Sequence, residues 1–219
     1  MKNEFEKRIL SSLVIVPIAL FFVIKGSIFF IFFLGTLFLT ISYEWIKMNK
    51  IKMIKILGIV YLIFALYLTY LMRKNFGLDI FILVMIVCIF TDIGGYTFGK
   101  IFKGPKLTKI SPNKTYSGLI GSFILSIIAA TVFIEYQKIN LIYWNFLDLV
   151  RNDFIYILFI LLISAISQIG DLIISFFKRL AKVKNTGKFL PGHGGLLDRL
   201  DGIIFALPAS YILLNFLNS

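Results

Sequence analysis

Acidic and basic side chains that could handle phosphate lie together in one stretch, residues 175–201. This stretch contains six Lys and Arg residues, the only histidine of the chain (His193), and two aspartates, Asp198 and Asp201. Five glycine and proline residues between 187 and 195 favour a shaped loop, because they release the backbone into turns. Backbone amides freed in this way, with cations around them, form phosphate sites, and the aspartates resemble metal ligands. The stretch therefore predicts chemistry on a phosphorylated substrate.

Three chemically useful side chains lead into this loop on one predicted helical face. Asp171, Ser175 and Lys178 are spaced by four and three residues, so a carboxylate, a hydroxyl and an ammonium share a stripe. Side chains on such a stripe can bind a metal ion and a phosphate at the same time. A plain ion pair between Asp171 and the basic residues that end the helix is the alternative. Asp198 and Asp201 are expected to open the last helix on one face, where the helix dipole alone also favours carboxylates.

The elements that position these residues are predicted to be transmembrane helices. The chain has 219 residues, of which 59% are hydrophobic, and its mean hydropathy is +0.92. Its apolar runs are continuous rather than alternating, which predicts an all-α polytopic membrane protein instead of a barrel. The first run lacks a small-residue cleavage site, so we expect it to remain as an anchor. We expect about seven spans, at Ile9–Ile24, Ser27–Tyr43, Ile56–Met72, Ile80–Phe98, Gly118–Tyr136, Phe154–Phe177 and Leu200–Leu217.

The distribution of basic residues predicts the orientation of the chain. A net charge of +12 could indicate nucleic acid, but the charges cluster between apolar spans, so we expect no nucleic-acid partner. Successive segments outside the spans carry 3, 1, 4, 2, 5, 2 and 6 basic residues. This alternation predicts a multi-pass protein of the inner (cytoplasmic) membrane, with its N-terminus in the cytoplasm and its C-terminus outside. Two basic loops, 99–117 and 178–199, then lie on the cytoplasmic side.

The fourth predicted span carries one more candidate residue. Asp92 lies in the inner half of that span, and an ionisable residue at membrane depth is a functional candidate. Two glycines follow at 94 and 95, which let a backbone or a ligand approach closely. We therefore expect residues 1–75 to form N-terminal membrane helices, and residues 76–219 to form a catalytic membrane region in which the two basic loops build the active site.

The spacing of these residues resembles the signature of the phosphatidate cytidylyltransferase (CDP-diacylglycerol synthase) family. The resemblance covers about Asp92 to Gly202, half the chain. Its residues are Ser175, Lys178-Arg179, Lys184, Gly187, Leu190-Pro191, His193-Gly194-Gly195, Asp198-Arg199 and Asp201, preceded by Asp92, Gly94, Tyr96, Gly99, Lys106-Leu107, Ser111-Pro112, Lys114-Thr115, Gly118, Gly121 and Gly170-Asp171-Leu172.

The resemblance implies transfer of CMP from CTP to phosphatidate, which gives CDP-diacylglycerol and pyrophosphate. It places Mg²⁺ on Asp171 and Asp198, and we expect Lys178 and Asp201 to join them as catalytic residues. The residues expected to bind substrate and phosphate are Asp92, Lys114, Ser175, Arg179, Lys184, His193 and Arg199. A monovalent cation such as K⁺ beside the Mg²⁺ is left open, as are base selectivity, acyl preference and oligomeric state, a homodimer included.

Three positions depart from the family pattern. Asn185, Ser117 and Ile174 stand where the family commonly has a carboxylate. If the protein is active, those carboxylates are dispensable. Two other classes remain as alternatives. A CTP- or ATP-dependent kinase of a lipid alcohol would transfer only the γ-phosphate, and an ion-coupled transporter would need charges nearer the midplane and broken helices in corresponding halves.

Overall fold

The structure is a computed structural model that describes residues 2–108, 110–139, 153–187, 189 and 194–218. Within these ranges the chain is helical, and extended pairing is limited to an isolated bridge between Lys106 and Thr115. The predicted all-α fold is confirmed. The helices are α1 (Lys2–Lys25), α2 (Ser27–Met48), α3 (Lys52–Asn75), α4 (Gly77–Phe102), α5 (Tyr116–Ile139), α7 (Asp153–Leu180), α8 (Leu197–Leu200) and α9 (Ile203–Asn218).

The long helices have the length and composition of membrane spans. Among the described residues, five helical segments are long and apolar enough to cross a bilayer: Ser27–Met48, Lys52–Asn75, Gly77–Phe102, Tyr116–Gln137 and Phe154–Leu180. Two shorter apolar segments, Ile15–Lys25 and Ile203–Leu217, accompany them. Each predicted span overlaps one of these segments. Large apolar side chains such as Ile28 and Phe154 are exposed on the outside, as expected of a protein whose surface faces lipid.

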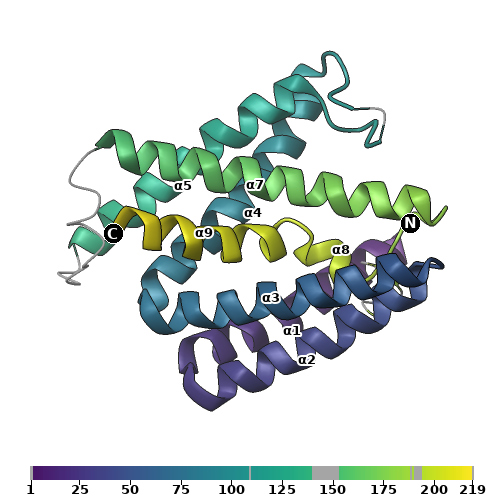
Figure 1. Ribbon diagram of the computed structural model, residues 1–219. Helices are drawn as coiled ribbons and strands as arrows, with labels where there is room; N and C mark the ends of the chain where they lie inside the picture. Colours follow the sequence, from purple (N-terminus) through teal and green to yellow (C-terminus); the bar gives the residue numbers. More distant parts are fainter. Residues whose placement is uncertain (1, 109, 140–152, 188, 190–193, 219) are drawn as a thin grey trace.

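The C-terminal helix lies in the middle of the bundle. Figure 1 shows α9 running lengthwise between α3 and α7, and α9 packs against both. Helix α2 packs on α3 and α1 on α2, while the pair α4–α5 covers α7. Fully buried side chains from α4, α7 and α9, including Leu83, Ile160 and Leu214, form the core between them. In lipid such close packing holds helices together, because the tails are as apolar as the side chains.

Glycines bring α4 and α5 into backbone contact. A Cβ built on Gly94 would lie 2.5 Å from the carbonyl oxygen of Gly121, and one on Gly118 would lie 2.6 Å from that of Gly95. No larger residue fits at these crossings without moving a helix, which is the small-residue packing typical of membrane helices. The contact matters for the site, because it fixes Asp92 of α4 beside the start of α5.

The last span begins later than predicted. Helix α8 ends at Leu200 and α9 begins at Ile203, so Asp198 lies in α8 and Asp201 in the turn that follows. The prediction that both aspartates open the last span was therefore wrong. Gly202 lets this turn approach α7 closely, because a Cβ there would lie 2.4 Å from the Oγ of Ser167. The turn thus sits directly against α7, which brings Asp201 next to that helix.

Candidate active site

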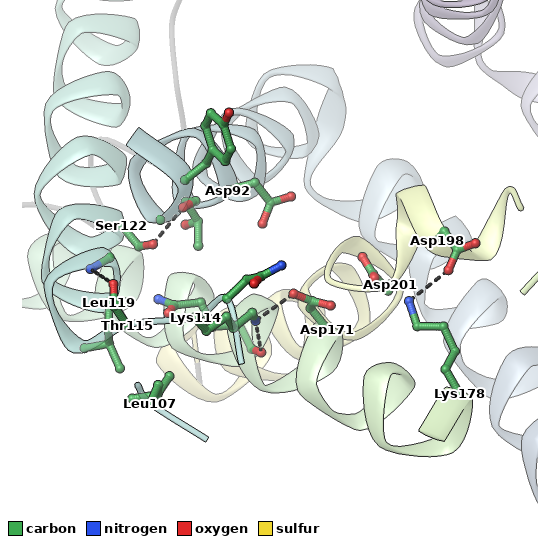
Figure 2. A pocket seen from close by; sticks show the side chains of 16 residues that line it. Asp92, Leu107, Lys114, Thr115, Leu119, Ser122, Asp171, Lys178, Asp198 and Asp201 are labelled. Carbon is green, nitrogen blue, oxygen red and sulfur yellow. Dashed lines mark hydrogen bonds and ion pairs between the residues drawn. The ribbon is translucent and has the colours of Figure 1, made fainter. Parts of the chain in front are cut away.

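A cavity of about 390 Å³ opens among α4, α5, α7 and the α8–α9 turn. It combines carboxylates, ammonium groups and small polar side chains, and Figure 2 shows how they lie around it. The lining residues are Thr91, Asp92, Gly95, Tyr96, Leu107, Asn113, Lys114, Thr115, Gly118, Leu119, Ser122, Gln168, Asp171, Lys178, Asp198 and Asp201. The size and the convergent polar groups are those of a small-molecule site.

The first ion pair of the cavity joins α7 to the loop before α5. Lys114 Nζ lies 2.6 Å from Asp171 Oδ2 and also donates to the carbonyl oxygen of Gln168, at 3.3 Å. Ser175 Oγ donates to Asp171 Oδ1 at 3.2 Å, which confirms that these two residues share a helical face. Asp171 thus pairs with a lysine from the other basic loop, rather than with the basic residues that end its own helix.

The second ion pair closes the loop between α7 and α8. Lys178 Nζ donates to Asp198 Oδ1 at 2.8 Å, and the two side chains are only 13% and 10% exposed. Asp198 Oδ2 accepts three further hydrogen bonds: from the backbone N–H of Thr186 (2.8 Å), its Oγ1 (3.1 Å) and the N–H of Gly195 (3.0 Å). These bonds fold the loop back, so that Asp198 lies beside α7 although 27 positions separate it from Asp171.

Asp201 lies between these two pairs, as Figure 2 shows. It is in the turn outside the spanning helices, within hydrogen-bonding contact of Asp171. Burial, followed by the negative charge of Asp171, raises the pKa of the Asp201 carboxyl. Two adjacent carboxylates repel each other, so a cation bound beside them would be favoured because it relieves that repulsion.

The predicted site residues that the structure describes divide into two groups. The structure brings six of them to the cavity: Asp92, Lys114, Asp171, Lys178, Asp198 and Asp201. Ser175 is buried behind Asp171, while Arg179, Lys184 and Arg199 are exposed and are not among the lining residues. Arg179 has another described contact, because its Nε donates to the carbonyl oxygen of Ile110 at 3.5 Å and so connects the two basic loops. His193 lies outside the described residues.

The chain resembles known proteins over most of its length. Residues 53–217 match the model of the Cytidylyltransferase family. The chain belongs to the cytidylyltransferase family. It is 38% identical over 149 residues to a phosphatidate cytidylyltransferase of Staphylococcus haemolyticus, covering 68% of this chain and 54% of the relative. The corresponding protein of Staphylococcus saprophyticus is 38% identical over 142 residues (64% and 51%), and that of Staphylococcus aureus strain COL is 36% identical over 149 residues (68% and 54%).

The chain spans about half the length of the curated relatives it matches. The matched family region contains every cavity residue, from Thr91 to Asp201. The part of the chain that matches the family model therefore includes the whole described site. The helices α1 and α2 precede the matched region.

The three departures from the family pattern have different surroundings in the structure. Ser117 Oγ donates to the carbonyl oxygen of Lys103 and lies 3.0 Å from Thr115 Oγ1. Ile174 is 5% exposed and packs in the apolar cluster that includes Leu197. Asn185 is exposed in the loop after α7. None of the three lines the cavity.

Two functional candidates escaped the sequence analysis. Gln168 lines the cavity, and its Nε2 is buried with no hydrogen-bond partner among the described residues. A buried donor without a partner costs free energy, so this amide is a candidate to meet a ligand oxygen. Glu44 of α2 is only 2% exposed. An ionisable residue inside an apolar helix is a feature that the sequence could have shown. The second span was predicted to end at Tyr43, however, which placed Glu44 in a loop.

The donor set of the cavity fits a hard cation. Among the described residues, no three His, Cys, Asp or Glu side chains lie close enough to enclose a metal ion by themselves. Mg²⁺ does not require that, because it is commonly held by one or two carboxylates together with water and substrate phosphates. The cavity offers aspartate oxygens and neither thiol nor described imidazole groups. This oxygen-only set suits Mg²⁺ better than a softer metal.

Proposed function

We propose that the protein is a nucleotidyltransferase, a phosphatidate cytidylyltransferase that transfers CMP from CTP to phosphatidate. One observation carries the proposal: two ammonium groups and four carboxylates converge on one cavity where the polar loops meet the ends of membrane helices. A nucleoside triphosphate needs the ammonium groups, and a cation that neutralises phosphate needs the carboxylates. The names of the relatives, all phosphatidate cytidylyltransferases, supply the substrates.

The reaction is a displacement at phosphorus. A phosphate oxygen of phosphatidate attacks the α-phosphorus of CTP, one P–O bond forms, and the bond between the α-phosphorus and the bridging oxygen to the β-phosphate breaks. CDP-diacylglycerol and pyrophosphate are the products. Because the attacking oxygen is already an anion, the protein has little covalent work to do. It must align the two phosphates and neutralise their charge.

The two ion pairs of the cavity provide that neutralisation. Lys114 and Lys178 are each held against an aspartate, so both ammonium groups already point into the cavity. We assign them to the phosphates of the two substrates. Asp171 and Asp198 are the proposed ligands of Mg²⁺, with Asp201 beside them. A bound Mg²⁺ supplies charge neutralisation and fixes the orientation of phosphate oxygens. Gln168 adds a neutral donor from the cavity wall.

The same arrangement suits a lipid substrate and a water-soluble one. The alternating basic counts support an orientation with the N-terminus and both basic loops in the cytoplasm. The cavity then lies at the inner surface, where a lipid phosphate in the cytoplasmic leaflet and CTP from solution can meet. The exposed apolar faces of α4 and α5, which include Ile93 and Ile120, lie on helices that border the cavity and suit the acyl chains.

Two labels of the same nucleotide test the proposal. Purified protein in lipid vesicles is given phosphatidate with CTP labelled either at the α- or at the γ-phosphate. We expect the α-label in lipid and the γ-label in pyrophosphate. A γ-label in lipid, with diacylglycerol as the preferred acceptor, would instead indicate a lipid kinase. Lys114→Gln should lose activity, whereas Lys52→Gln, at an exposed lysine that starts α3, is the matched control.

A further inference from the structure

A buried carboxylate from outside the cavity holds the active-site loop. Glu44 of α2 is 2% exposed and accepts hydrogen bonds from three groups of the segment 186–197. Its Oε1 accepts from the N–H of Leu196 at 2.8 Å. Its Oε2 accepts from the N–H of Leu197 at 2.9 Å and from Thr186 Oγ1 at 3.0 Å. One side chain thus fixes both ends of the loop before α8.

The hydroxyl of Thr186 connects this carboxylate to the cavity. Thr186 Oγ1 lies 3.0 Å from Glu44 Oε2 and 3.1 Å from Asp198 Oδ2. A hydroxyl carries one proton, so the two carboxylates share a single donor. Asp198 in turn holds Lys178. A continuous chain of polar contacts therefore runs from α2 to the ammonium group that we assign to substrate phosphate.

The loop is shaped to bring its backbone against this carboxylate. A Cβ built on Gly195 would lie 2.0 Å from Thr186 Oγ1 and 2.5 Å from Glu44 Oε2. One built on Gly187 would lie 2.8 Å from Glu44 Oε1. Only glycine permits such an approach, so two glycines of the loop are matched to one acid on a distant helix.

We propose that Glu44 is a positioning residue of the active site, which acts through Thr186 and α8 to hold Asp198 and Lys178 in place. It does not line the cavity and so does not touch substrate. The inference rests on the proposed function for its catalytic consequence. It also extends the site beyond the matched family region, which begins at residue 53. The N-terminal helices, expected as a separate part of the chain, then contribute to catalysis.

The variant Glu44→Gln tests the role of the carboxylate, because glutamine has nearly the same size as glutamate but carries no charge. Both carboxylate oxygens face N–H donors, so the amide –NH₂ of glutamine would point at one of them whichever way it turns. We expect faster hydrogen exchange in peptides that cover 186–197. We also expect kcat to fall roughly tenfold to a hundredfold, the range of a lost hydrogen bond to a charged group, with the KM for CTP changed far less. The matched control is Glu135→Gln, at an exposed glutamate of α5.

A second pair of variants covers the case in which Glu44→Gln does not fold. Thr186→Val removes the shared hydroxyl at constant shape, and Thr186→Ser restores it. We expect turnover to be slower in Thr186→Val, and we expect Thr186→Ser to retain most of the turnover of the unaltered protein. Equal turnover in both would overturn the proposal, and so would unchanged exchange or unchanged kcat in folded Glu44→Gln. If the unaltered protein transfers no CMP, the proposed function fails, while the exchange data still decide whether Glu44 holds the loop.

Discussion

The pair Lys178–Asp198 allows a test that separates stability from chemistry. In Asp198→Asn the amide oxygen can take the position of Oδ2 and keep its three donors. The –NH₂ group then faces the ammonium of Lys178, so a buried cation loses its partner. The double variant Asp198→Asn/Lys178→Met removes that cation at nearly constant volume. We expect the double variant to recover stability but not activity.

The distance and burial of the Lys178–Asp198 pair set the expected loss of stability. At 2.8 Å, and with an effective dielectric constant of about 20, the gross attraction of the pair is about 6 kcal/mol. The side chains are 13% and 10% exposed, so solvent screens them little, and breaking such a buried pair costs about 3–5 kcal/mol. With both charges gone, the loss should shrink to about 1–2 kcal/mol, since replacing a buried pair by apolar groups is often nearly neutral.

The assay is unfolding of each variant by SDS in mixed micelles, run beside CMP transfer. Asp79→Asn is the control. The Asp79 carboxylate of α4 accepts a hydrogen bond from Gln137 Nε2 at 3.2 Å, but it does not line the cavity. A double variant that is no more stable than Asp198→Asn would refute the buried ion pair. A double variant that regains activity together with stability would show that the pair is structural only.

Four further outcomes are expected. Asp171→Asn should raise the half-saturating Mg²⁺ concentration roughly tenfold or more, measured by activity and by Mn²⁺ binding in electron paramagnetic resonance, because one ligand charge is lost. Gln168→Leu should raise the KM for a substrate about tenfold without lowering stability, since its amide is unpaired now. Gly94→Ala should destabilise the fold by about 1–3 kcal/mol in the same SDS titration, whereas Gly35→Ala, with open space around it, should not. A cysteine replacing Lys103 should react with an impermeant maleimide only after cells are opened.

Local periodicity predicted much of this protein. The continuous apolar runs predicted the helices, since lipid allows few other folds. The spacing of Asp171 and Ser175 predicted their shared face, and the structure confirms it with a hydrogen bond. The cavity residues Asp92 and Lys114 were also named in advance, Asp92 because it is an ionisable residue inside an apolar span and Lys114 because it belongs to the family signature that the sequence resembles.

The partners of the charges could not be predicted in the same way. Asp171 pairs with Lys114, which is 57 positions away in the chain, and Glu44 meets Leu197 at a separation of 153. Such contacts depend on how helices pack and on a loop whose bends are set by single glycines. Glu44 was missed because helix ends are difficult to predict. The second helix ends at Met48, five residues later than predicted, so this buried acid was assigned to a loop.

The position of α9 between α3 and α7 has a consequence for how the protein is made. A ribosome delivers helices to the membrane in chain order, so α3 and α7 are inserted before the helix that separates them. Until α9 arrives, the groove between them must stay open or hold lipid. Asp201 stands in the turn that leads into α9, and it reaches Asp171 only when that helix has docked. The cavity of the nascent protein therefore gains its complete set of carboxylates only at the last insertion step.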